Sequence, residues 1–270
     1  MIEKKHIQTI LGLTLALLVL GVAYWWYSTN AKVAQQTGEQ TKNTISEGGI
    51  GAEISKGEGT ITQIPVNLDL AVPGAAHPNL NRPIAFPDGY DADAKRIIQS
   101  NIATLTAQLK TDQNSFQAWM DLAVQYKIIE DLEGAREIWE FLNKAAPENT
   151  VSRVNLGNLY HYELKDFEKS EKNFKEAIGI NEEIPEAHLG LFELYRYSYK
   201  TNTNLAEMTL IDAMTALPKN LTIRLTLAAH YHGTGRNAES KALYEETRTL
   251  AEGQRNTTVV AQIDAALAEF

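Results

Sequence analysis

The sequence predicts an all-α protein in which an α-solenoid of about four helix hairpins follows one transmembrane helix and a flexible linker. Three observations support this architecture. An uncharged apolar run occupies residues 7–27, a stretch rich in Gly, Thr and Pro follows at residues 28–90, and a helical pattern then repeats about every 34 residues. The predicted parts are a short N-terminus at 1–6, a transmembrane helix at 7–27, a linker at 28–90 and a helical domain at 91–270.

Residues 7–27 have the length and the end chemistry of a membrane-spanning helix. At ~1.5 Å per residue the run covers the ~30 Å hydrocarbon layer, and it closes with four aromatic rings that suit the headgroup region. Lys4 and Lys5 precede the run, so the positive-inside rule places residues 1–6 in the cytoplasm. We therefore expect a single-pass protein of the cell membrane whose chain from residue 28 onward lies on the extracytoplasmic side. Cleavage near residues 28–31 is the alternative, which the long and bulky apolar run disfavours.

The predicted linker has two parts of different composition. Residues 28–59 are rich in Thr, Gln, Gly and Ser, which is typical of flexible chain. Between residues 65 and 87, prolines recur among apolar side chains, which indicates a stiffer and more extended segment. The sequence leaves open whether this second part packs on the helical domain.

The helical domain contains an internal repeat. Four units cover residues 116–149, 150–184, 185–220 and 221–254. In each unit, small side chains stand where the two helices of a hairpin approach closely, and aromatic side chains fill the space between them. Segments 91–109 and 257–270 are amphipathic and would cap the two ends of the stack. The recurring positions of the first helices hold Trp119, Leu122, Ala123 and Tyr126; Arg153, Leu156, Gly157 and Tyr160; His188, Leu191, Phe192 and Tyr195; and Arg224, Leu227, Ala228 and Tyr231.

These signatures resemble the tetratricopeptide repeat (TPR) family over roughly half of the chain, from residue 116 to about residue 252. The resemblance implies a right-handed α-solenoid whose concave groove binds peptide segments of other proteins. The sequence departs from the family pattern at several points. One extra residue precedes Ser170, two precede Ala206, and Thr247 stands where Ala is usual. These departures make the unit boundaries less certain to place, but the repeat itself is still identified.

The composition argues against several other functions. With 25 Lys and Arg against 34 Asp and Glu, the net charge is −9, which opposes binding to the phosphates of nucleic acids. The chain has no cysteine, no HExxH string, no phosphate-binding loop and no nucleophile elbow. We therefore expect no enzyme activity, no catalytic residue, no cofactor and no metal site. His230 and His232 are the nearest pair of candidate ligands, but residues two apart on a helix point about 200° apart.

The resemblance also locates the predicted groove on the first helix of each unit. Its early positions are all apolar, and its late positions are all basic or titratable, with tyrosines beside two of them. A bound peptide would place apolar side chains on the first row and carboxylates near the second. The alternative is that the apolar row packs adjacent units and that the basic residues pair with Glu186 and Glu193. The predicted groove residues are Met120, Lys127, Val154, Asn158, His161, Tyr162, Leu189, Glu193, Arg196, Tyr197, Leu225 and His232.

Together these predictions describe a membrane-anchored scaffold that binds peptide segments of other proteins in the cell envelope, outside the cytoplasmic membrane. Two other arrangements stay open. In the reverse orientation, the array would face the cytosol as a docking receptor for chaperones or precursors, although Lys4 and Lys5 count against it. Alternatively, the arrays would associate with one another as an envelope structural protein.

Overall fold

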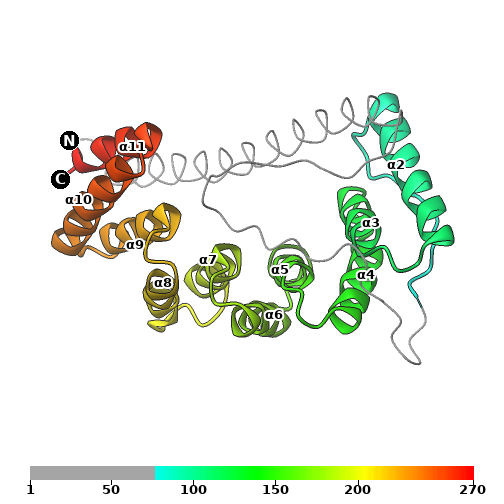
Figure 1. Ribbon diagram of the computed structural model, residues 1–270, viewed down its shortest axis with the longest axis horizontal. Coiled ribbons are helices and arrows are strands. Elements are labelled where there is room, and N and C mark those ends of the chain that lie inside the picture. Colours follow the sequence, from blue (N-terminus) through cyan, green and yellow to red (C-terminus); the bar gives the residue numbers. More distant parts are fainter. Residues whose placement is uncertain (1–76) are drawn as a thin grey trace, which may run out of the picture. The chain divides into compact units, whose positions relative to one another are not determined.

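A computed structural model describes residues 77–270 of the chain. This part consists of ten α-helices and two short π-helical turns, and it contains no β-strand (Figure 1). Among residues 77–270, no helix is both long and apolar enough to cross a membrane. The predicted transmembrane helix at 7–27 and the predicted linker up to residue 76 lie outside the described residues.

Eight of these helices form four hairpins, whose first helices begin within one residue of the predicted unit starts. Each helix packs against the next along the chain, so the hairpins stack in sequence order (Figure 1). A π-helical turn continues the first helix of the second and of the third hairpin. The elements are α2 (Ala92–Thr111); α3 (Phe116–Ile128) and α4 (Leu132–Ala145); α5 (Val151–Asn158), η1 (Leu159–Glu163) and α6 (Phe167–Ile180); α7 (Pro185–Glu193), η2 (Leu194–Ser198) and α8 (Leu205–Ala216); α9 (Leu221–Gly233) and α10 (Asn237–Gly253); and α11 (Thr257–Leu267).

Local capping explains where several of these helices begin. The Ser115 hydroxyl accepts the Ala118 N–H at 3.4 Å before α3, and the Asp131 carboxylate accepts the Gly134 N–H at 2.9 Å before α4. Each contact satisfies one of the amides that the first turn of a helix leaves unpaired. Pro185 occupies the first position of α7, where its missing N–H costs nothing.

Small residues allow neighbouring hairpins to approach closely around Phe174 of α6. This ring is fully buried between Gly157 of α5 and Gly190 of α7. A Cβ atom would lie 2.6 Å from the ring at Gly157 and 2.4 Å from it at Gly190. Ser170 fills a third small position and donates its hydroxyl to the Gly157 carbonyl at 2.8 Å. Gly157 and Ser170 are predicted small positions, whereas Gly190, where the approach is closest, is a small residue that the repeat does not predict.

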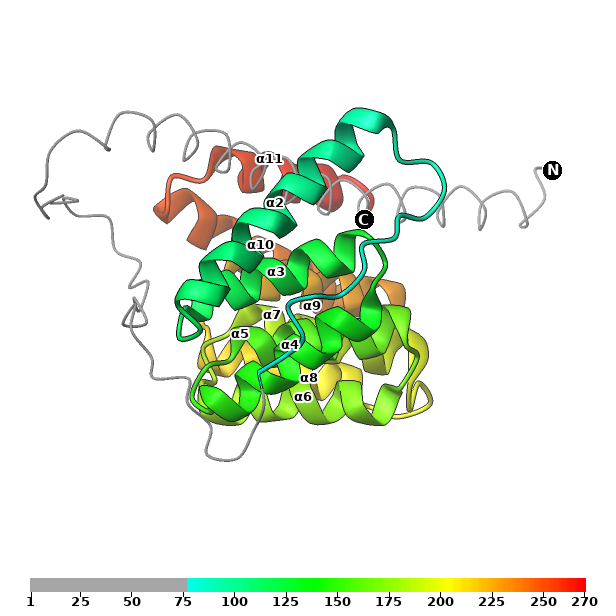
Figure 2. The same ribbon diagram turned by 90° about the vertical axis from the view of Figure 1, so that its right-hand side faces the viewer.

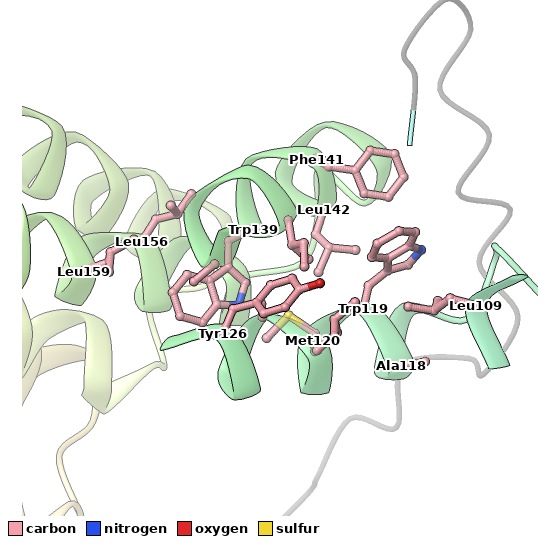
Figure 3. Packing of buried hydrophobic residues seen from close by; sticks show 14 of the residues in the cluster. Leu109, Ala118, Trp119, Met120, Tyr126, Trp139, Phe141, Leu142, Leu156 and Leu159 are labelled. Carbon is pink, nitrogen blue, oxygen red and sulfur yellow. The ribbon is translucent and has the colours of Figure 1, made fainter. Parts of the chain in front are cut away.

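The apolar interior continues from one hairpin to the next. One cluster of buried side chains is centred on Trp119, Tyr126 and Trp139 of the first hairpin (Figure 3). This cluster also includes Leu156 and Leu159 of the second hairpin. A second cluster spans the other three hairpins and α11. No hairpin buries its apolar surface alone, which is the packing expected of a solenoid.

One extra residue in each of the second and third units is accommodated in η1 and η2, and the third unit also has a longer connection between Ser198 and Leu205. The Leu164 N–H bonds to the Leu159 carbonyl at 3.0 Å, and the Tyr199 N–H bonds to the Leu194 carbonyl at 2.8 Å. Both bonds reach five residues back, as in a π-helix. In the first hairpin, which has no extra residue, the Ile129 N–H bonds to Gln125, four residues back. The π turns thus absorb added residues while the hairpins keep their stacking.

Residues 77–90 belong to the predicted linker, and they run in an extended conformation along the first hairpin to the start of α2 (Figure 2). Leu80, Ile84, Phe86 and Tyr90 pack against the first cluster. We call residues 77–90 the strap. The strap and α2 together cover the N-terminal end of the stack.

Candidate peptide-binding face

The predicted apolar row lies within the packing between hairpins. Met120 and Val154 are buried, and Figure 3 shows Met120 inside the first cluster, near Tyr126. Leu189 and Leu225 are half-buried and pack against the second cluster. None of the four is exposed, so their main contacts are with the protein itself.

His161 is also buried, although it falls in the predicted basic row. Its Nε2 atom is hydrogen-bonded to Ser198 Oγ at 2.8 Å, and its ring stacks on Tyr162 with the centroids 4.1 Å apart. Burial, and to a smaller extent the charge of Lys165, lower the pKa of His161. The ring is therefore neutral at pH 7 and adds no positive charge to the row. Asn158, one turn earlier, is half-buried.

The other members of the basic row are accessible and have no carboxylate partner. Lys127 and Arg196 are half-buried, and His232 is exposed. None of them forms a salt bridge within residues 77–270, so neither Glu186 nor Glu193 neutralises them there. Seven of the nine arginines in the described part are in salt bridges. Arg196 and the exposed Arg255 are the two exceptions.

Arg196 lies beside an aromatic ring. Its guanidinium is over the Tyr197 ring, 5.9 Å from the centroid. A Cβ atom on Gly233 of the next hairpin would lie 3.8 Å from Arg196 Nη2, so the guanidinium lies near the end of that hairpin's first helix. Glu193 and Arg196 are three residues apart, a spacing that favours a pair on a regular α-helix. Here η2 begins between them, and they form no salt bridge.

Three of the exposed apolar side chains follow the predicted basic row by one residue. Ile128, Tyr162 and Tyr197 occupy the same position in three consecutive hairpins, and they are 39%, 42% and 61% exposed. In the fourth hairpin this position holds Gly233. Sequence reasoning missed Ile128, and the signal was available, because Ile128 follows Lys127 as Tyr162 follows His161 and Tyr197 follows Arg196.

Tyr162 links the second hairpin to the third. Its hydroxyl donates a hydrogen bond to the Glu193 carboxylate. Burial of the hydroxyl, the Glu193 charge and, to a lesser degree, Tyr197 raise the pKa of Tyr162, so the phenol stays protonated. The ring remains partly exposed beside this bond. The binding face, as we define it, comprises Lys127, Ile128, Tyr162, Glu193, Arg196 and Tyr197.

The side chains of this face are of two kinds, apolar and charged. Within residues 77–270, no group of three or more His, Asp or Glu side chains is placed to hold a metal ion. What the face offers is aromatic and aliphatic surface, two unpaired cations and one carboxylate. Such a set suits recognition of a peptide that carries apolar and acidic side chains.

Comparisons with known proteins concern the fold. No known protein-family profile and no curated protein matches the chain. The solved structures similar to it include MamA, which is 16% identical with a TM-score of 0.47, over 62% of this chain and 98% of that one. A thermophilic TPR protein of Thermus thermophilus is 22% identical with a TM-score of 0.46, over 64% of this chain and 94% of that one. YrrB, described as a TPR protein with an unusual peptide-binding site, is 13% identical with a TM-score of 0.43, over 64% of this chain and 86% of that one.

Proposed function

We propose that this chain is a membrane-anchored TPR scaffold that binds peptide segments of other proteins through the binding face, outside the cytoplasmic membrane. One observation carries the binding role. Exposed apolar side chains recur at the same position of three consecutive hairpins, and two of them, Ile128 and Tyr197, directly follow cations that form no salt bridge within residues 77–270. Exposed apolar rows beside unpaired charges are typical of interaction sites. The role is that of an adaptor, not a catalyst.

The chemistry of the face defines the peptide. Ile128, Tyr162 and Tyr197 provide surface for apolar side chains spaced along the ligand. Arg196 can form two parallel hydrogen bonds to one carboxylate, and its guanidinium already lies over the Tyr197 ring. Lys127 provides a second positive charge near the first hairpin. The ligand is therefore an acidic and apolar peptide segment.

Charge reversal at Arg196 tests this role. The probe is an array of short synthetic peptides in which each acidic and apolar sequence is paired with its Asn and Gln counterpart. We expect the full-length chain to prefer the acidic member, and Arg196→Glu to weaken that binding by about 1.5–3 kcal/mol, or roughly ten- to a hundredfold. Arg255→Glu is the matched control, because Arg255 is also an unpaired arginine but lies at the turn after α10. Equal weakening by both variants would show that only net charge matters.

The location is tested separately. The uncharged run at 7–27, its aromatic end, and Lys4 and Lys5 support an anchor with the helical domain on the extracytoplasmic side. A reporter that is active only outside the membrane, fused after Phe270, should be active on a full-length, membrane-bound chain. An inactive reporter would favour the cytosol-facing docking receptor instead. Light scattering that rises steeply with concentration would favour the self-assembling structural protein.

A further inference from the structure

The strap binds the first hairpin in the manner of an extended peptide ligand. Its residues alternate between half-buried and exposed side chains, as expected when one side of an extended chain faces a surface. Figure 2 shows it crossing the first hairpin before α2 begins. The half-buried members are Leu80, Arg82, Ile84 and Phe86, and the exposed members are Asn79, Asn81, Pro83 and Ala85.

Arg82 is the central anchor of the strap. Its Nε and Nη2 atoms donate to the two Asp131 carboxylate oxygens at 2.7 and 2.8 Å, and its Nη1 atom donates to Glu137 at 2.9 Å. The side chains of Arg82 and Asp131 are each only 20% exposed. A two-pronged contact of this kind is selective for arginine, because lysine cannot form both parallel bonds.

Two aromatic contacts fix the ends of the strap. At one end the His77 ring stacks on Trp119, with an interplanar angle of 14° and centroids 6.1 Å apart, and lies 5.1 Å from the Phe141 ring. At the other end the Tyr90 hydroxyl donates to the Ile128 carbonyl at 2.5 Å. The strap thus spans the full length of the first hairpin.

The strap can detach without unfolding the helices beneath it. Among residues 77–270, no hydrogen bond between backbone N–H and C=O groups joins the strap to α2, α3 or α4. Its apolar anchors are all half-buried, and a hollow of about 340 Å³ lies between Leu80, Arg82, Ile84 and helix α2. Helix α2 packs on α3 independently through Ile98, Ile102 and Leu109. Segments with few fully buried contacts open at low free-energy cost.

We propose that the surface beneath the strap is a second peptide-binding site, masked in cis by the strap, and selective for an extended segment with an arginine between alternating apolar residues. Within residues 77–270, it meets the binding face only at the Ile128 carbonyl, which accepts from Tyr90, and its selectivity comes from acidic groups of α4 and the rings of Trp119 and Phe141 instead of Arg196 and its neighbours. A short tether keeps the strap at an effective concentration in the millimolar range. An external segment of the same chemistry therefore binds only when the strap is weakened.

A labelled strap peptide added in trans tests the proposal. The probe is a fluorescent synthetic peptide of residues 77–90, and the protein is the full-length chain in detergent. Arg82→Glu in the protein places a third carboxylate beside Asp131 and Glu137 and should release its own strap. We expect the peptide to bind this variant at least about tenfold more tightly than wild type, as measured by fluorescence anisotropy. The same peptide carrying Arg82→Glu should bind neither protein.

Two controls keep the result decisive. Arg96→Glu changes an exposed arginine of α2 that pairs only with its neighbour Asp93, so it should leave the strap in place and the peptide unbound. Glu137→Gln removes one partner of Arg82 but keeps the Asp131 cap of α4, and it serves if Arg82→Glu fails to fold. Equal peptide binding by wild type and a released variant would overturn the proposal. The proposal would also be overturned if the peptide did not bind a variant that folds, whether or not hydrogen exchange shows that the strap of this variant is released.

Discussion

At the scale of single residues, Phe174 sets the spacing between the second and third hairpins. Its ring has no freedom to move aside, because it is fully buried between two glycines on different helices. The distances to a hypothetical Cβ atom show that the glycines are required by contact and not by backbone conformation. A methyl group added at either position would push the ring or the helices apart.

Gly190→Ala is therefore expected to destabilise the protein. Overpacking against Phe174 costs about 1–3 kcal/mol, which exceeds the ~1 kcal/mol that alanine gains over glycine within a helix. Urea denaturation of the full-length chain measures the change in unfolding free energy. Gly179→Ala is the matched control, since a Cβ atom there meets nothing within 4 Å, and it should leave stability unchanged or slightly raised. Equal stability of the two variants would contradict this account.

His161 shows which residue-scale features a sequence cannot supply. Its position in the repeat predicts an accessible titratable side chain, yet its partner Ser198 lies 37 residues further along the chain. Burial of the ring depends on how the third hairpin packs on the second. By contrast, the small residues at 157 and 170 could be predicted from the period, whereas Gly190 lies two residues before the recurring position, which Phe192 occupies in its unit, and was not predicted.

At the scale of elements, the residues at which helices begin could be predicted, but the π-helical turns at the ends of two helices could not. Ser115 and Asp131 cap helices within four residues of themselves, so the signal is local. The count of extra residues before Ser170 and Ala206 predicts an irregularity but not its form. The structure resolves it as π turns, which alter the rotation per residue. The π turns do not explain why the exposed row lies one residue after the predicted basic row, because Ile128 shows the same offset in the first hairpin, which has no π turn.

Deletion of Glu163 should convert η1 into regular α-helix without loss of the fold. The segment from Tyr160 to Asp166 would then have the length of the segment from Tyr126 to Asp131 in the first hairpin, which has no π turn. Because π-helical bonds are less favourable than α-helical bonds, we expect stability within about 1 kcal/mol of wild type or slightly above it. Circular dichroism and urea denaturation measure this. Deletion of the buried Leu159 is the contrasting control and should disrupt the hairpin. Severe destabilisation by the Glu163 deletion would mean that η1 is required for stacking.

At the scale of the whole molecule, stability is set by contacts between neighbours. Each hairpin packs on the next, and the apolar clusters pass from one to another without a single central core. In such an array the free energy of unfolding is approximately a sum of hairpin terms and interface terms. Because each hairpin packs only on its neighbours, the repeat could be predicted from the sequence. The packing of the strap could not be predicted from the sequence. Its Arg82 contacts residues 49 and 55 positions away, and the repeat pattern does not relate these residues to Arg82.

A substitution at the end of the array and one in its middle should therefore destabilise different sets of helices. Arg82→Ala removes a contact with Asp131 and Glu137 at the N-terminal end, so faster amide exchange is expected in the strap and in α4 but not in α9 and α10. Gly190→Ala weakens the interface between two central hairpins, so exchange should accelerate from α5 to α8. Hydrogen exchange with mass spectrometry resolves these segments. A uniform acceleration in both variants would instead mean that residues 77–270 unfold as one cooperative unit, and nearest-neighbour additivity would then not hold for this array.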